Sequence, residues 1–263
     1  MDWQAPAIIL EMRPFGEHDA IATLLTEAEG RRRGLVRGGQ GRRQAALWQS
    51  GNLIAARWQG RLAEQLGHFT AEPIRVAAAL VLDDPLRLAL LSAICATIAG
   101  ALPEQAPHPR VFAALWRLIE GVSGPETAAA GLAELVRFEA GLLAELGYGL
   151  DLSSCALTGV GEDLAFVSPR SGRAVSRAAA GPWRGRLLCL PAFLCDPEAA
   201  IDAEALAAGL RLTGHFLARE VFGARHQPLP AARQALYERV LRLAEPGLSH
   251  EGERREESPC PKS

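Results

Sequence analysis

The sequence predicts an α+β multidomain protein, in which a five-stranded barrel of the OB-fold type precedes a mainly α-helical domain with a small irregular insertion. Three observations predict this architecture. Short apolar segments separated by turn residues fill the first part of the chain, which is typical of strands. After Val76 the apolar residues recur at steps of three and four, which indicates helices. Residues 151–194 then interrupt the helical pattern with glycines, serines and prolines.

The first domain is expected at residues 1–77. Glycine- and proline-containing turns, such as Pro14-Phe15-Gly16-Glu17 and Gly38-Gly39, separate its apolar segments. The OB-fold is the commonest small barrel with five strands, so it is the barrel that we expect. The predicted strands are 7–12, 20–26, 34–37, 52–58 and 64–70.

The helical domain is expected at residues 78–245, with the insertion at 151–194. Asp84-Pro85 predicts a capped helix start with proline in its first turn, and Gly100 an end. Later helices are predicted after Pro109, from Pro125 to a stop at Gly147, after Asp196-Pro197 and over 230–243. Residues 246–263 are polar, charged and proline-containing, so we expect a disordered tail.

Composition excludes several classes of protein. The chain of 263 residues is 49% hydrophobic, enough for a folded core, but no run approaches the roughly 18 apolar residues of a membrane span. With no signal-peptide pattern at its start, we expect a cytoplasmic protein. The only lysine is Lys262, which excludes a Walker A phosphate loop and Schiff-base chemistry. The net charge of -2 means that any DNA site is local.

The clearest charge feature lies in the barrel segment, between Glu29 and Glu64. This stretch contains no acidic residue, and Trp48 and Trp58 are interleaved with its arginines. Arginines that track a phosphate backbone and aromatic rings that stack on bases are the two components of single-strand binding. The alternatives are a solvated basic loop with core tryptophans, and a barrel that binds a protein. The arginines are Arg31, Arg32, Arg33, Arg37, Arg42, Arg43, Arg57 and Arg61.

No catalytic or metal-binding pattern stands out. Cys155, Cys189 and Cys195 show neither the C-x-x-C spacing of a zinc site nor an adjacent histidine. Buried structural cysteines explain them better, and we expect no metal and no enzyme activity. A hydrolase that uses Cys155 as nucleophile remains as the enzymatic alternative.

Four motifs, in this order along the chain, resemble the RecO family of recombination mediators. The turn from Arg13 to Asp19 resembles the family's R-x-x-G-E-x-D turn, and Val36-Arg37-Gly38-Gly39 its V-R-G-A/G segment. Residues 137–148 are similar to its R-F-E-x-x-L-L-x-x-L-G-Y helix. Residues 210–217, followed by Pro228-Leu229-Pro230, resemble its C-terminal helix and the loop after it.

The resemblance implies an N-terminal OB-fold, a helical domain, and binding without turnover. Family members bind DNA, displace or bypass the single-strand-binding protein, anneal complementary strands, and work with RecR to load RecA, which implies a nucleoid-associated protein. By position, the segment from Arg31 to Arg43 would form the DNA face. Arg137 would receive the acidic C-terminal tail of the single-strand-binding protein; the alternative is an ordinary exposed helix arginine.

The insertion departs from the family pattern. Many relatives carry two C-x-x-C pairs that hold zinc, whereas this chain has Cys155-Ala156-Leu157-Thr158 and Ser176-Arg177-Ala178-Ala179. Three of four ligands are missing, so we expect no zinc and no cofactor. The insertion keeps five arginines with no acid between Asp163 and Asp196, and these are expected to extend the DNA surface: Arg170, Arg173, Arg177, Arg184 and Arg186.

Overall fold

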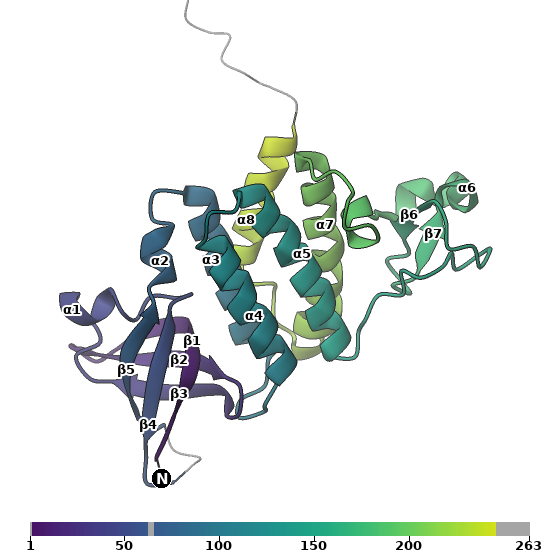
Figure 1. The fold of residues 1–263 in the computed structure, drawn as a ribbon. Helices are drawn as coiled ribbons and strands as arrows, with labels where there is room; N and C mark the ends of the chain where they lie inside the picture. Colours follow the sequence, from purple (N-terminus) through teal and green to yellow (C-terminus); the bar gives the residue numbers. More distant parts are fainter. Residues whose placement is uncertain (1, 63–65, 246–263) are drawn as a thin grey trace, which may run out of the picture.

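A computed structural model describes residues 2–62 and 66–245 of the chain. A β-barrel lies at one side of a bundle of helices, and the insertion projects from the opposite side (Figure 1). The predicted tail at 246–263 lies outside the described residues, as does the start of the strand predicted at 64–70. The domain boundaries inferred from the sequence stay predictions.

The barrel is closed, with strand order β1-β2-β3-β5-β4. All neighbouring strands are antiparallel except β3 and β5, which meet in parallel at Leu35 and His68. This topology confirms the predicted OB-type barrel. The strands are β1 (Asp2–Phe15), β2 (Asp19–Thr26), β3 (Gly30–Val36), β4 (Leu53–Gln59) and β5 (His68–Arg75).

Three strands differ from prediction in their bounds. β1 spans Asp2–Phe15 rather than 7–12, so Arg13 and Phe15 lie in a strand. β3 begins at Gly30 rather than at residue 34, so Arg31, Arg32 and Arg33 lie in a strand and not in a loop. β5 runs to Arg75 instead of ending at residue 70. The expected basic loop also contains a short helix, α1 (Arg42–Ala45). A strand accepts arginines because their long stems cover apolar surface while the charged heads stay wet.

The helical domain is confirmed as mainly helical, and its capping follows the sequence signals. The Asp84 side chain accepts hydrogen bonds from the N–H groups of Leu86 and Arg87, and Thr127 caps the third long helix. The helices are α2 (Ala77–Leu80), α3 (Pro85–Ala101), α4 (Pro109–Val122), α5 (Ala128–Glu145), α7 (Ala203–Phe216) and α8 (Ala231–Ala244), with short helical turns η3 (Leu217–Phe222) and η4 (Gly223–Arg225) after α7.

The barrel and the helices share one hydrophobic core. Ile8, Leu10, Leu25 and Leu53 of the barrel are buried in the same cluster as the inward faces of the helices. A second cluster, centred on Trp58 and Phe69, fills the barrel interior. Since buried apolar surface stabilises by about 25 cal/mol per Å², this shared core holds the barrel against the bundle.

A buried ion pair joins three helices. The Arg233 guanidinium of α8 donates through Nε to Glu139 Oε1 of α5 at 2.6 Å, and through a terminal nitrogen to Glu139 Oε2 at 2.9 Å. Both side chains are at most 1% exposed. The Thr213 hydroxyl of α7 also donates to Glu139, and Leu210 of α7 accepts from Arg233 through its carbonyl. Every charge in this cluster therefore has a partner.

The insertion is built around a small three-stranded sheet with its own core of Cys155, Phe166, Val175 and Ala180. The backbone N–H of Ser176 donates to the Cys155 sulfur at 3.3 Å, and the Ser176 hydroxyl accepts from the Ala179 N–H. Its elements are β6 (Leu164–Val167), β7 (Ala174–Ser176), α6 (Arg177–Ala180), η1 (Gly181–Arg186), β8 (Leu188–Cys189) and η2 (Ala192–Leu194).

The residues at the four zinc positions of the resemblance do not fit a zinc ion. They supply one thiol, two hydroxyls and a methyl group, whereas structural zinc needs four nitrogen or sulfur ligands. Instead they bond to one another. The N–H of Ser176, with the hydroxyls of Thr158 and Ser176, lowers the pKa of the Cys155 thiol to about 6.

This environment also bears on the hydrolase alternative. The Cys155 thiol is buried, and its hydrogen-bond partners are two backbone amides and two hydroxyls. A cysteine nucleophile needs an adjacent base and access for the substrate. The geometry does not favour Cys155 as a nucleophile.

No helix within residues 2–62 and 66–245 is long and apolar enough to cross a membrane.

Replacing Arg233 with alanine should lower the free energy of unfolding by about 3–5 kcal/mol, because Glu139 is left as a buried, unpaired charge. Urea unfolding followed by circular dichroism measures the change. Arg242→Ala is the matched control, since Arg242 is exposed on the same helix and surface substitutions change stability by about 0.5 kcal/mol or less. Equal effects of the two substitutions would show that the ion pair does not hold the helices together.

The Cys155 thiol should titrate near pH 6, because its hydrogen bonds favour the thiolate. The ultraviolet thiolate absorbance of the wild type minus that of Cys155→Ser measures this titration. Cys195→Ser is the control, since burial raises the pKa of that thiol. A Cys155 titration at the ordinary value of about 8.5 would contradict the hydrogen-bonded cluster.

Candidate nucleic-acid interface

The arginines of β3 lie on both faces of the strand and are paired with carboxylates. Glu104, in the loop after α3, lies 3.7 Å from an Arg31 terminal nitrogen and 2.5 Å from Arg33 Nε. Gly30 allows this loop to pack tightly, because its φ is +66° and a Cβ there would lie 2.2 Å from the Ala106 carbonyl oxygen. Arg32 pairs instead with Glu29 at 2.7 Å and lies over the Trp58 ring.

Arg57 is paired as well, with Asp2 at 3.0 Å. The acid-free stretch of the sequence is therefore not an acid-free face of the barrel. The reason is that Asp2 reaches Arg57 from the neighbouring strand β1, Glu29 reaches Arg32 from the turn before β3, and Glu104 reaches Arg31 and Arg33 from the loop after α3. Arg33 and Arg57 keep about half of their side-chain surface exposed.

Trp48 does not lie where base stacking requires. Its side chain is 3% exposed in the barrel core, and its ring N–H donates to Gln44 Oε1 at 2.9 Å. Trp58 is also buried, and its ring N–H donates to the Leu66 carbonyl at 3.2 Å. Both tryptophans are therefore core residues, as the alternative interpretation expected. The prediction that Trp48 stacks on a base is wrong, because its ring is buried.

One end of the barrel presents exposed arginines beside an exposed aromatic ring. The hairpin after β1 and the turn after β3 are bonded together there: Asp19 accepts from the Gly38 N–H at 2.8 Å, and the Gln40 amide donates to the Gly16 carbonyl at 3.1 Å. Phe15, at the end of β1, is 52% exposed. We call this surface the barrel tip: Arg13, Phe15, Gly16, Glu17, His18, Arg37 and Arg42.

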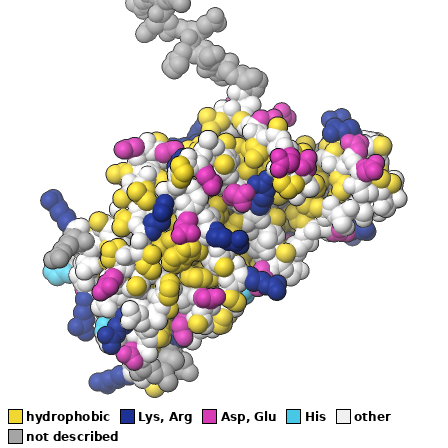
Figure 2. Space-filling model, in the orientation of Figure 1, with side chains coloured by type: hydrophobic (Ala, Val, Ile, Leu, Met, Phe, Trp, Pro, Cys, Tyr) yellow, Lys and Arg dark blue, Asp and Glu magenta, His cyan; other side chains and the backbone are white. Residues whose placement is uncertain are grey.

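Arg37 and Arg42 are the exposed arginines of the barrel tip that form no ion pair with any described residue. The side chain of Arg43 lies outside the described part of the structure. In Figure 2 the side chains that project from the outer edge of the barrel are mostly basic, whereas acidic and basic side chains are interspersed over the helices. The net positive surface of the barrel is thus local.

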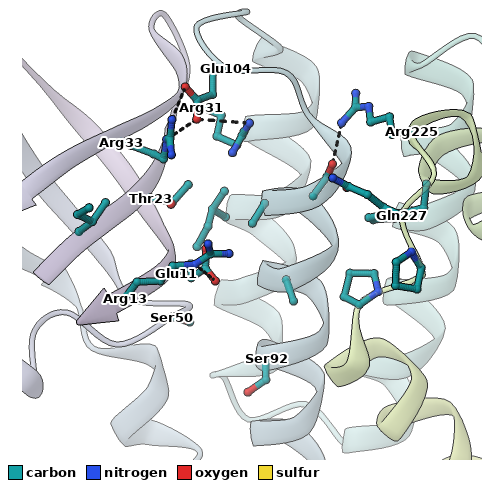
Figure 3. Close-up of a pocket in the computed structure, with 18 residues that line it drawn as sticks. Glu11, Arg13, Thr23, Arg31, Arg33, Ser50, Ser92, Glu104, Arg225 and Gln227 are labelled. Atoms are coloured by element: carbon teal, nitrogen blue, oxygen red, sulfur yellow. Dashed lines mark hydrogen bonds and ion pairs between the residues drawn. The ribbon is translucent and has the colours of Figure 1, made fainter. Parts of the chain in front are cut away.

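A cavity of about 680 Å³ lies between the barrel and the helices (Figure 3). β1, β2 and β3 form one wall, and α3 with the segment after η3 forms the other. Four arginines and two glutamates line it: Arg13, Arg31, Arg33, Arg225, Glu11 and Glu104. Its volume and positive excess suit a small anionic group.

Arg31 is the most enclosed cation of this cavity. Burial lowers the pKa of its guanidinium, and the carboxylate of Glu104 opposes that effect. Its buried Nε has no hydrogen-bond partner among the described residues. A buried donor without an acceptor costs about 1–3 kcal/mol. Since Nε is closed to solvent, an anion in the cavity would meet the remaining exposed part of the Arg31 side chain, which is 18% exposed.

Arg137 lies beside a second hollow, a groove of about 420 Å³ between α4 and α5. Its Nε and one terminal nitrogen donate to the Phe193 carbonyl, and the other terminal nitrogen pairs with Glu134 at 2.5 Å. Arg137 therefore connects α5 to the end of the insertion. Arg117 lines the same groove, is exposed, and has no ion pair among the described residues.

Sequence reasoning missed several residues of these surfaces. The sequence places Phe15 and Arg13 in a turn, but their exposure could not be inferred from it. Arg117 lies in a helix with a mostly apolar sequence, and nothing in that sequence indicates that its side chain lines a groove. Arg225 joins the cavity only because η4 folds back against α3, where it donates to the Gly100 carbonyl at 2.7 Å.

Comparison with known proteins identifies the family. The model for the N-terminal domain of recombination protein O matches residues 1–77, and the model for its C-terminal domain matches residues 82–228. A protein of Acidiphilium cryptum called DNA repair protein RecO is 58% identical over 245 residues, covering 92% of this chain and 96% of its own.

Two further relatives carry the same name. The protein of Granulibacter bethesdensis is 51% identical, covering 95% of this chain and 100% of its own. That of Rhodospirillum rubrum is 46% identical, covering 92% of this chain and 97% of its own. With both family models matched along most of its length, the chain belongs to the RecO family of DNA repair proteins.

Proposed function

We propose that this chain binds single-stranded DNA at its barrel tip and acts as a mediator of homologous recombination. The observation that carries the proposal is the juxtaposition of unpaired, exposed Arg37 and Arg42 with the exposed ring of Phe15. Arginines neutralise phosphates, and an exposed ring stacks on a base at about 1–3 kcal/mol per base. Phe15 takes the stacking role for which Trp48 is not accessible.

The interdomain cavity extends this interface. Arg13 belongs to both the barrel tip and the cavity lining, so a strand that leaves the tip meets the cavity next. A backbone phosphate there faces the guanidinium groups of Arg31, Arg33 and Arg225. Contacts to phosphate carry no sequence information, so duplex DNA is a second ligand for the same arginines.

The mediator role requires partners as well as DNA. By its family, the chain anneals complementary strands and works with RecR to load RecA onto DNA coated by the single-strand-binding protein. The α4/α5 groove fits the C-terminal tail of that protein, because Leu118, Val122 and Phe138 offer apolar surface beside Arg117 and Arg137. Since Arg137 is already engaged, Arg117 receives the terminal carboxylate. DNA binding of this kind predicts association with the nucleoid.

Arg37→Gln/Arg42→Gln should weaken binding of single-stranded DNA. The slope of log K against log salt concentration should become shallower by about 0.7 for each phosphate that is no longer neutralised. Fluorescence anisotropy of a labelled oligonucleotide across a salt series measures both. Arg211→Gln/Arg242→Gln, on exposed helix positions, is the control of equal charge. Phe15→Ala should weaken binding without changing the slope, and Phe15→Trp should restore it.

Wild-type protein that binds no DNA in a salt-sensitive way would favour the alternative of a protein-only adaptor, whose barrel binds a partner. Equal weakening in the barrel-tip variant and the control of equal charge would mean that overall charge, and not the tip, governs binding.

Arg117→Gln should weaken binding of an acidic peptide with an apolar C-terminal residue about tenfold, the effect of removing one hydrogen bond to a charged group. Fluorescence anisotropy of the labelled peptide measures the affinity. Arg110→Gln, on the same helix outside the groove, is the matched control. Amidating the peptide's C-terminus should weaken binding to a similar degree in the wild type and little further in Arg117→Gln; additive effects would refute the contact.

A further inference from the structure

The insertion exposes a tryptophan that its core does not use. Trp183 lies in η1 and is 56% exposed, whereas the insertion's core consists of Cys155, Phe166, Val175 and Ala180. Tryptophan is highly buried on average, because its large ring gains much from leaving water. A ring left outside a nearby core therefore indicates a surface that contacts something else.

The charges around Trp183 are unbalanced. Arg186 lies over the Trp183 ring, 5.4 Å from its centroid, and Arg184 lies over the Phe166 ring at 5.6 Å. Two of the three acidic residues of the insertion are already paired, Asp151 with Arg173 and Asp163 with Arg177, while the exposed Glu162 forms no ion pair with a described residue. Arg184 and Arg186 are exposed and form no ion pair with any described residue. We call Trp183, Arg184 and Arg186 the Trp183 patch.

The patch is remote from the barrel tip. The insertion projects from the side of the helical bundle opposite the barrel (Figure 1). The arginines of the insertion therefore do not continue the surface of the barrel directly, because the bundle lies between the two. A ligand at the Trp183 patch occupies a surface separate from the barrel tip.

We propose that the Trp183 patch is a second site for single-stranded nucleic acid. A ring with a free face and adjacent guanidinium groups without carboxylate partners matches what a strand offers, namely a base to stack and phosphates to neutralise. The inference deepens the proposed function and rests on it in one respect: two separated sites let one chain hold both strands that annealing joins.

The chemistry favours a strand over a protein partner. A stable protein interface buries about 800 Å² on each side around an apolar centre, and its core is depleted of charge. The Trp183 patch instead carries two unpaired cations, one over the Trp183 ring and one over the Phe166 ring, on a short turn between Gly181 and Arg186. Each guanidinium would lose water in an apolar interface, whereas a phosphate replaces that water.

The test isolates the second site in the full-length chain. In the Arg37→Gln/Arg42→Gln background, salt-sensitive binding of an oligothymidine should persist at reduced affinity, and Trp183→Ala should weaken it a further tenfold or so, as removal of one stacked base implies. Trp183→Phe should restore most of the affinity, and Arg184→Gln/Arg186→Gln should reduce the salt slope. Thermal unfolding checks that each variant is folded, as expected for exposed positions.

The outcomes separate the two proposals. Residual binding that Trp183→Ala leaves unchanged overturns the second site, while the barrel-tip site stands. If the barrel-tip variant binds DNA as well as the wild type, and Trp183→Ala abolishes that binding, the proposed barrel-tip site is overturned and the Trp183 patch is supported. If Trp183→Ala weakens binding of purified RecR and leaves DNA binding unchanged, the patch is a protein surface and the inference fails.

Annealing gives an independent readout. At DNA concentrations that saturate the wild type, Trp183→Ala should slow annealing of two complementary strands several-fold while anisotropy still reports a bound first strand. An annealing rate equal to that of the wild type would show that a second strand is not held at the patch.

Discussion

The ion pair between Glu139 and Arg233 is the contact on which the helical domain depends. It joins α5, α7 and α8 in surroundings where neither charge can be left alone. The chain between α7 and α8 then has fixed ends, and it contains Phe222, Arg225 and Gln227, which line the cavity facing the barrel. The pair thus positions one wall of the candidate DNA interface without touching it.

The motifs that identify the family are explained by the same logic. Glu139 of the R-F-E motif and Thr213 of the L-T-G segment both contact Arg233. In the barrel, Asp19 of the turn motif accepts from Gly38 of the V-R-G-G segment. Residues far apart in sequence therefore form mutual contacts, which explains why the motifs occur together. The motif residues hold the candidate binding surfaces in place, while other residues form those surfaces.

The fold was predictable because its signals are local. Asp84-Pro85 caps a helix and short apolar segments form strands whatever lies elsewhere in the chain. The site was less predictable, because it depends on distant partners. Nothing near Arg31 and Arg33 in sequence indicates that Glu104 neutralises them, and nothing near Trp48 or Trp183 indicates that one is buried and the other exposed. Only the closed barrel and the projecting insertion decide these points.

Pairing, rather than composition, decides where this acidic chain attracts an anion. The arginines of β3 form ion pairs with carboxylates, as do Arg173 with Asp151 and Arg177 with Asp163. Unpaired guanidinium groups remain at the barrel tip and at the Trp183 patch. At physiological ionic strength a charge is screened over about 8 Å, so the remote acidic residues that make the net charge -2 do little at either place. The two proposed sites are therefore local surfaces on opposite sides of the bundle, where a polyanion would meet unpaired guanidinium groups despite the negative net charge of the molecule.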